Sequence, residues 1–432
     1  MRHLTFICII ILIWGCNSTK KGKIIVSEND MKQSRIAFSE LEEILKNDGG
    51  KLWNHNLYGP ILIINRETRT IYANEQNEPG ELKKQGVLFI GKFPENRNIG
   101  NSVTEWNGKL WAMVGLPLRE TKEERLSELI HESFHRIQPE IGFDSLAEKQ
   151  NLHLDTKEGR IFLKLEMEAL KQALQSENPE THIKNALLFR LYRQKLFPYS
   201  DISENSLEIN EGIAEYTGSI LCGLNNSDLQ KHYSAQIDLF FTMPTFVRSF
   251  AYFTIPIYGY YMKQKDYYWN QKITKKTNLT KFISCFFNVS YTKLDPDKVL
   301  IIEKSYNLDS ISKFEEKREG IRLGLIKKYK AQFLEDSVLT IMLEKMEIAF
   351  NAKNAMPLDS FGTVYPNLRI TDNWGILTVD SCSALVSPDW NYVTISYPKM
   401  ITDSLITGKG WKLKLNEGWK LEKKNLKYIL TK

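Results

Sequence analysis

The stretch Leu129-Ile130-His131-Glu132-Ser133-Phe134-His135-Arg136-Ile137 contains two histidines four residues apart within a helical pattern. Residues i and i+4 of an α-helix share one face, so His131 and His135 can direct their imidazoles at one metal ion. Glu132 follows His131 directly, and its carboxylate can reach a water molecule bound to that metal. A catalytic zinc needs three protein ligands and one open position, so we expect a third ligand elsewhere in the chain.

The best candidate for that ligand lies in Leu207-Glu208-Ile209-Asn210-Glu211-Gly212-Ile213-Ala214-Glu215-Tyr216. Three carboxylates, those of Glu208, Glu211 and Glu215, recur on one side of a helix that is otherwise mostly apolar. Carboxylates this close repel one another unless a cation lies nearby, which favours a metal site over a solvated acidic face. Two acids at shorter spacing from the histidines stay open as alternative ligands: Glu166 and Glu168.

The two motifs together resemble those of the gluzincin metallopeptidases, the thermolysin-like and aminopeptidase-like group. The resemblance spans roughly residues 55–265. It implies an α+β, zincin-like catalytic core, in which a mixed β-sheet precedes the active-site helices. It also implies one Zn²⁺ per chain and a peptide or protein as substrate. The residue roles that it implies are His131, His135 and Glu211 as zinc ligands, Glu132 as general base, and Glu215 as the group that orients a ligand histidine.

Gluzincins also use a tyrosine or a histidine to stabilise the oxyanion. The aromatic stretch downstream of the acidic helix offers Tyr252, Tyr258 and Tyr261 for this role. Tyr258 is favoured as the catalytic tyrosine, because Pro256 and Gly259 on either side are expected to hold it in a loop. An aromatic core cluster is the alternative interpretation of the same stretch.

The first residues indicate an export signal. A basic start, Met1-Arg2-His3, precedes an almost wholly apolar run over residues 4–14, which is too short to span a bilayer. The run ends in Leu12-Ile13-Trp14-Gly15-Cys16, which resembles the bacterial lipobox and implies that Cys16 is lipidated. An ordinary secretory signal with an incidental cysteine is the alternative. No acidic residue directly follows Cys16, so we expect a lipid anchor in the bacterial cell envelope, at the outer membrane facing the periplasm.

Composition narrows the class of protein. The 432 residues are enough for two or three domains, and the hydrophobic, charged and aromatic fractions are those of a globular protein. The net charge of +6 is spread evenly along the chain, so we expect no nucleic-acid partner. The five cysteines form no Cys-x-x-Cys pair, which disfavours a disulfide-stapled or cysteine-zinc protein.

Local patterns divide the chain into successive parts. The expected parts are a leader (1–15), a polar tether (16–34), the mainly β part of the catalytic domain (35–120), its helical part with the zinc site (121–335), and a small C-terminal β domain (336–432). Within them we expect a strand at 110–114, a helical hairpin at about 157–197, one helix over 206–222, and a hairpin of 411–415 with 419–421. The resemblance to gluzincins implies that the strand at 110–114 lies at the edge of its sheet.

The leader, the histidine motif and the acidic helix together favour a lipid-anchored zinc metallopeptidase. The alternative is a catalytically inactive, zincin-like binding or scaffold lipoprotein that uses the β domain as its interaction module. A glycan hydrolase is a third hypothesis, but the sequence offers no visible pair of carboxylates for it. The tryptophans of the β domain could form a sugar platform, although the core of that domain is the favoured interpretation: Trp374, Trp390, Trp411 and Trp419.

Overall fold

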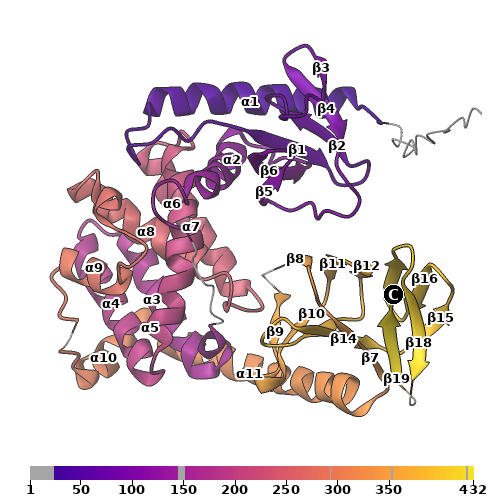
Figure 1. Ribbon diagram of the computed structural model, residues 1–432. Helices are drawn as coiled ribbons and strands as arrows, with labels where there is room; N and C mark the ends of the chain where they lie inside the picture. Colours follow the sequence, from indigo (N-terminus) through magenta and orange to yellow (C-terminus); the bar gives the residue numbers. More distant parts are fainter. Residues whose placement is uncertain (1–23, 145–150, 292, 352–353, 425–426) are drawn as a thin grey trace, which may run out of the picture.

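The computed structural model describes residues 24–144, 151–291, 293–351, 354–424 and 427–432. An N-terminal sheet, a large helical part and a strand-rich C-terminal domain follow one another along the chain (Figure 1), which confirms the expected α+β class. The expected leader, with Cys16, lies outside the described residues. Within the described part of the chain, no helix combines the length and the apolarity needed to cross a membrane.

The first helix, α1 (Glu28–Asp48), begins inside the segment that was expected to be a tether. Ser27 caps it, because the Ser27 side chain accepts a hydrogen bond from the Asp30 backbone N–H at 3.2 Å. Acidic side chains in the first turn, Glu28 and Asp30, also favour a helix start at this point. The predicted boundary at residue 34 is therefore wrong, and the folded body starts before it.

The N-terminal sheet has the strand order β3-β4-β2-β1-β6-β5. Strands β1 and β6 are parallel, and the other neighbours are antiparallel. The expected edge strand at 110–114 is wrong: β6 lies between β1 and β5, with its side chains buried from Trp111 onward, and β5 is the outer strand. The bounds are β1 (Ile61–Asn65), β2 (Thr70–Ala73), β3 (Lys83–Gln85), β4 (Leu88–Lys92), β5 (Ser102–Trp106) and β6 (Lys109–Leu116).

The helical part begins with the histidine-bearing helix α2 (Lys122–Ile137). Thr121 caps this helix by accepting from the Glu124 N–H at 3.2 Å, as the capping-box pattern predicts. The expected helical hairpin is formed by α3 and α4. The remaining helices are α3 (Lys157–Gln175), α4 (Pro179–Leu196), α5 (Ser200–Leu207), α6 (Ile213–Leu221), α7 (Asn226–Thr242), α8 (Ala251–Lys265), α9 (Leu279–Phe286), α10 (Pro296–Ile302) and α11 (Leu308–Lys330).

The helix expected over 206–222 is interrupted by a wider turn. Helix α5 runs into a π-helical segment, Glu208–Gly212, which continues directly into α6. The segment packs closely on α8, because a Cβ atom at Gly212 would lie 2.8 Å from the Cβ of Ile255. π-Helical turns inside α-helices occur frequently at functional sites, and this one carries Glu211.

The C-terminal domain packs two sheets, with strand orders β7-β14-β13-β10-β9 and β15-β16-β17-β12-β11-β8, and adds the ribbon β18-β19. The predicted hairpin of 411–415 with 419–421 is wrong, because β17 pairs with β12 and β16. Trp374 and Trp411 lie in the core of the domain, as expected, and Trp390 and Trp419 pack against that core. The bounds are β7 (Val338–Met342), β8 (Glu347–Phe350), β9 (Met356–Pro357), β10 (Thr363–Tyr365), β11 (Leu368–Asp372), β12 (Gly375–Val379), β13 (Ala384–Val386), β14 (Tyr392–Ser396), β15 (Pro398–Ile401), β16 (Leu405–Gly408), β17 (Trp411–Leu415), β18 (Lys420–Lys424) and β19 (Lys427–Thr431).

Candidate metal centre

Three predicted ligands meet at one point between α2 and the π-helical segment. The Nε2 atoms of His131 and His135 are 3.0 Å apart, and the Glu211 Oε2 atom lies 3.5 Å from the first and 3.3 Å from the second. A tetrahedral zinc with bonds of about 2.0–2.1 Å would hold its ligand atoms about 3.3 Å apart. The spacing and the chemistry of this donor set therefore fit a zinc ion.

Close helix packing holds the two ligand-bearing elements together. A Cβ atom at Gly218 on α6 would lie 2.5 Å from the Ser127 carbonyl oxygen on α2, so only glycine allows this approach. Trp53 contacts both helices. Its ring packs on Phe134 of α2, and its Nε1 donates a hydrogen bond to the Thr217 hydroxyl of α6 at 2.9 Å. The ligand atoms are therefore brought together by rigid helices and not by loops.

Each histidine is also held through its second ring nitrogen. His131 Nδ1 lies 2.8 Å from the Glu215 carboxylate, the contact expected of a group that orients a ligand histidine. His135 Nδ1 lies 2.6 Å from the side-chain oxygen of Gln138. Gln138 is not among the predicted site residues, although its position three residues after His135 places it one turn further along the same helix face.

Glu132 lies beside the three predicted ligands but is not a member of the ligand set. Its side chain is 5% exposed, and within the described part of the chain its Oε2 atom has no hydrogen-bond partner. Burial raises the pKa of this carboxyl to about 7, against the opposing effect of the neighbouring His131 and His135. A carboxylate in this setting can accept a proton near neutral pH.

The favoured tyrosine lies away from the metal centre. Tyr258 is on α8, where a loop was expected, and its fully buried hydroxyl donates to Glu166 at 3.0 Å. Tyr252, one helix turn and a half earlier, lines the cleft at the metal centre instead. Its hydroxyl donates to Glu211 Oε2 at 2.5 Å, and its ring stacks on that of His131. The geometry thus brings Tyr252, and not Tyr258, to the ligands.

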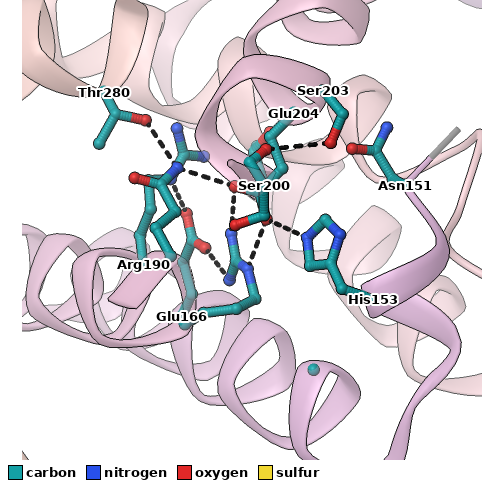
Figure 2. A network of polar contacts seen from close by, with 12 residues as sticks. Asn151, His153, Glu166, Arg190, Ser200, Ser203, Glu204 and Thr280 are labelled. Atoms are coloured by element: carbon teal, nitrogen blue, oxygen red, sulfur yellow. Dashed lines mark hydrogen bonds and ion pairs between the residues drawn. The ribbon is translucent and has the colours of Figure 1, made fainter. Parts of the chain in front are cut away.

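The alternative ligand Glu166 belongs to a buried ion network (Figure 2). One of its oxygens accepts from Arg190 and the other from Arg193, each at 2.7 Å. Glu208 pairs with Arg190 as well, so the cation beside this member of the acidic helix is an arginine. The carboxylates of Glu166 and Glu208 therefore form structural ion pairs with buried arginines. The other alternative, Glu168, accepts from the Gln172 side chain and lines a separate pocket.

A large cleft opens in front of the metal centre. It has a volume of about 1490 Å³, and its lining residues come from α2, α7, α8, β5 and, on the opposite wall, β8, β11 and β12 of the C-terminal domain. The two domains are joined at this cleft by polar contacts. Glu347 on β8 forms an ion pair with Arg97, with 2.6 Å between the Glu347 Oε1 and Arg97 Nε atoms, and Arg369 on β11 donates to the Glu95 carbonyl oxygen at 2.6 Å. The C-terminal domain thus forms one side of the site.

Comparisons of the chain with known protein families, with curated proteins and with solved structures gave no match. The functional interpretation therefore depends on the geometry of the site. That geometry combines three converging ligand atoms, a buried carboxylate beside them, and a cleft with space for a large substrate.

Proposed function

We propose that this chain is a zinc metallopeptidase that hydrolyses peptide bonds, with Glu132 as its general base. The observation that carries the proposal is the buried Glu132 carboxylate, whose Oε2 has no hydrogen-bond partner among the residues that the structure describes, beside three ligand atoms at zinc-like spacing. A structural zinc site has no need of a buried carboxylate that is not itself a ligand. The combination of a ligand triad with a separate buried carboxylate therefore favours catalysis over an inactive binding role.

The roles of the side chains follow from their positions. His131, His135 and Glu211 would hold the zinc, which supplies a Lewis acid and a water of lowered pKa when it is bound. Glu132 would accept a proton from the attacking water and pass it to the leaving amine. Tyr252 can turn its hydroxyl from Glu211 to the substrate carbonyl oxygen and stabilise the negative charge that develops there.

The cleft favours a polypeptide over a small molecule as the substrate. Its volume of about 1490 Å³ exceeds the roughly 300–1,000 Å³ of ordinary small-molecule pockets. Two outer strands, β5 and β8, both contribute to its walls. The backbone edge of an outer strand can pair with an extended main chain. We therefore propose an extended peptide segment as the substrate.

We also propose that the protein is lipid-anchored in a bacterial cell envelope, at the outer membrane facing the periplasm. The support is the leader sequence and its lipobox-like end at Cys16. In a bacterial host, the full chain should fractionate with membranes, and Cys16→Ser should release the protein or block its processing. Unchanged membrane fractionation of Cys16→Ser would contradict the anchor.

The peptidase proposal is tested with purified protein that lacks the leader. Metal analysis should find one zinc per chain, and an unbiased peptide library should reveal cleavage that a chelator abolishes and added zinc restores. His131→Ala should lose both the zinc and the cleavage, because only two ligands remain. Bound zinc without cleavage of any peptide would favour the binding or scaffold alternative, and absence of zinc would refute the metal centre itself.

A further inference from the structure

The hydrogen bonds of Gln138 determine which nitrogen of His135 can bind a metal. The Gln138 side-chain nitrogen donates to the Asn210 backbone carbonyl oxygen at 3.1 Å. A carbonyl oxygen only accepts hydrogen bonds, so the amide nitrogen has to face Asn210 and the amide oxygen has to face His135. His135 Nδ1, 2.6 Å from that oxygen, must then carry the proton. The lone pair of Nε2 is left free on the side of the predicted ligands.

The same amide connects the two elements that supply the ligands. Gln138 directly follows α2, and its backbone N–H donates to the Phe134 carbonyl oxygen at 3.0 Å, which keeps it on the helical path. Its partner Asn210 lies in the π-helical segment, and the Asn210 side chain donates to Glu211 Oε1 at 3.0 Å. Gln138 thus connects the ligand His135 to the backbone of Asn210, whose side chain contacts the neighbouring ligand Glu211.

We propose that Gln138 is a positioning residue of the metal centre, which fixes the tautomer of His135 and the placement of Glu211 relative to α2. This inference rests on the proposed zinc site. It identifies a neutral amide as the partner of one ligand histidine, whereas the other, His131, is held by the Glu215 carboxylate. Second partners of this kind contribute about 10–100-fold to metal affinity in proteins.

The test compares the zinc affinity of variants with similar side-chain length. Gln138→Met removes both hydrogen bonds, and we expect zinc to bind about 10–100-fold more weakly in competition with a chromophoric chelator. Gln138→Glu keeps an acceptor for His135 Nδ1 and loses only the donor to Asn210, so most of the affinity should return. Gln172→Met, on α3 and bonded to Glu168, is the matched control and should bind zinc like the wild type.

Two further measurements separate positioning from a purely structural role. The metal-free Gln138→Met protein should still unfold in one cooperative transition, so that its weaker zinc binding does not come from loss of the fold. The visible spectrum of the cobalt-loaded protein, which reports ligand geometry, should change only for Gln138→Met. Wild-type zinc affinity in Gln138→Met would overturn the inference alone. Equal weakening in Gln138→Met and Gln138→Glu would overturn the role of Gln138 in fixing the tautomer of His135. A wild-type protein that binds no zinc would overturn the proposed function and this inference together.

Discussion

Tyr252 lies parallel to His131, with ring planes 3° apart and ring centroids separated by 5.7 Å. This stacking limits the movement of the Tyr252 ring, while its hydroxyl donates to the Glu211 oxygen nearest the two histidines. A phenol held in this way has a fixed position beside the ligands and a hydrogen bond that it can redirect. This relationship makes Tyr252 the tyrosine to test for a role in catalysis.

Tyr252→Phe should reduce turnover of a cleaved peptide about 10²–10³-fold, because the oxyanion loses a donor, while zinc content stays at one per chain. Tyr258→Phe is the matched control. Its hydroxyl donates to the buried Glu166, so its loss should lower the free energy of unfolding by about 1–3 kcal/mol and leave turnover per folded molecule unchanged. Peptide kinetics and urea unfolding distinguish the two. Lost turnover in Tyr258→Phe together with unchanged turnover in Tyr252→Phe would instead make Tyr258 the catalytic tyrosine.

Glu132→Gln keeps the size of the side chain and removes the base. Zinc content and melting temperature should remain near those of the wild type, since the three ligands are untouched. Cleavage should fall by about 10²–10⁴-fold, the usual contribution of a positioned general base. Metal analysis and peptide kinetics on the same preparation check both expectations. Full zinc with undiminished cleavage would remove Glu132 from the mechanism.

Glu211→Ala should lose zinc binding, whereas Glu166→Ala should lose stability. Glu211→Ala should lose tight zinc binding and keep its fold, because the carboxylate faces the metal site and the cleft. Glu166→Ala leaves two buried arginines, Arg190 and Arg193, without a shared carboxylate. Loss of one partner of a buried ion pair costs about 3–5 kcal/mol, so this variant should unfold at much lower urea concentration. Zinc retained in Glu211→Ala would mean that the third ligand is misassigned.

Glu204 is expected to make the fold sensitive to acid. Burial alone would raise the pKa of this carboxyl, but the ion pair with Arg193 and the contact with His153 outweigh it and hold the pKa well below the ordinary 4.5. A lowered pKa in the folded state means that the contribution of Glu204 to stability is present above about pH 4.5 and is lost as the pH falls further. Urea unfolding of the metal-free protein over a pH series should show this loss.

The variant Glu204→Gln should be less stable than the wild type at pH 7 by about 3–5 kcal/mol, because Arg193 keeps its burial and loses a charged partner. Its stability should then decline less steeply on acidification, since the titrating group is gone. Parallel curves for the two proteins below pH 4.5 would show that other carboxylates cause the acid sensitivity.

The parts of the site that sequence could predict are those set by spacing along one helix. His131 and His135 share a face because they are four residues apart, and the cap at Thr121 fixes where that helix begins. Glu211 and Glu215 could be found because they repeat the same spacing. Tyr252 and Tyr258 both lie in one aromatic run, and the choice between them depends on how α8 packs against the π-helical segment, which sequence does not specify.

The errors in the fold have a similar origin. Alternation in residues 411–415 correctly indicates a strand with one buried face, but it does not say which strands will be its neighbours. Glu208 was grouped with the metal-site acids on regular helical spacing, and the π-helical segment carries it to Arg190 instead. The start of α1 had a usable signal in Ser27 and the acids after it, which the lysine-rich surroundings obscured.

The wide turn at Glu208–Gly212 makes this region sensitive to the number of its residues as well as to their identity. A π-helical turn holds one residue more than the α-helical turn it replaces. Deletion of one residue here would restore regular winding and rotate every upstream side chain by roughly 100° relative to Glu215. Glu204 would then point away from Arg193. An insertion or deletion between Glu204 and Glu215 would therefore break both the ion network and the ligand set at once.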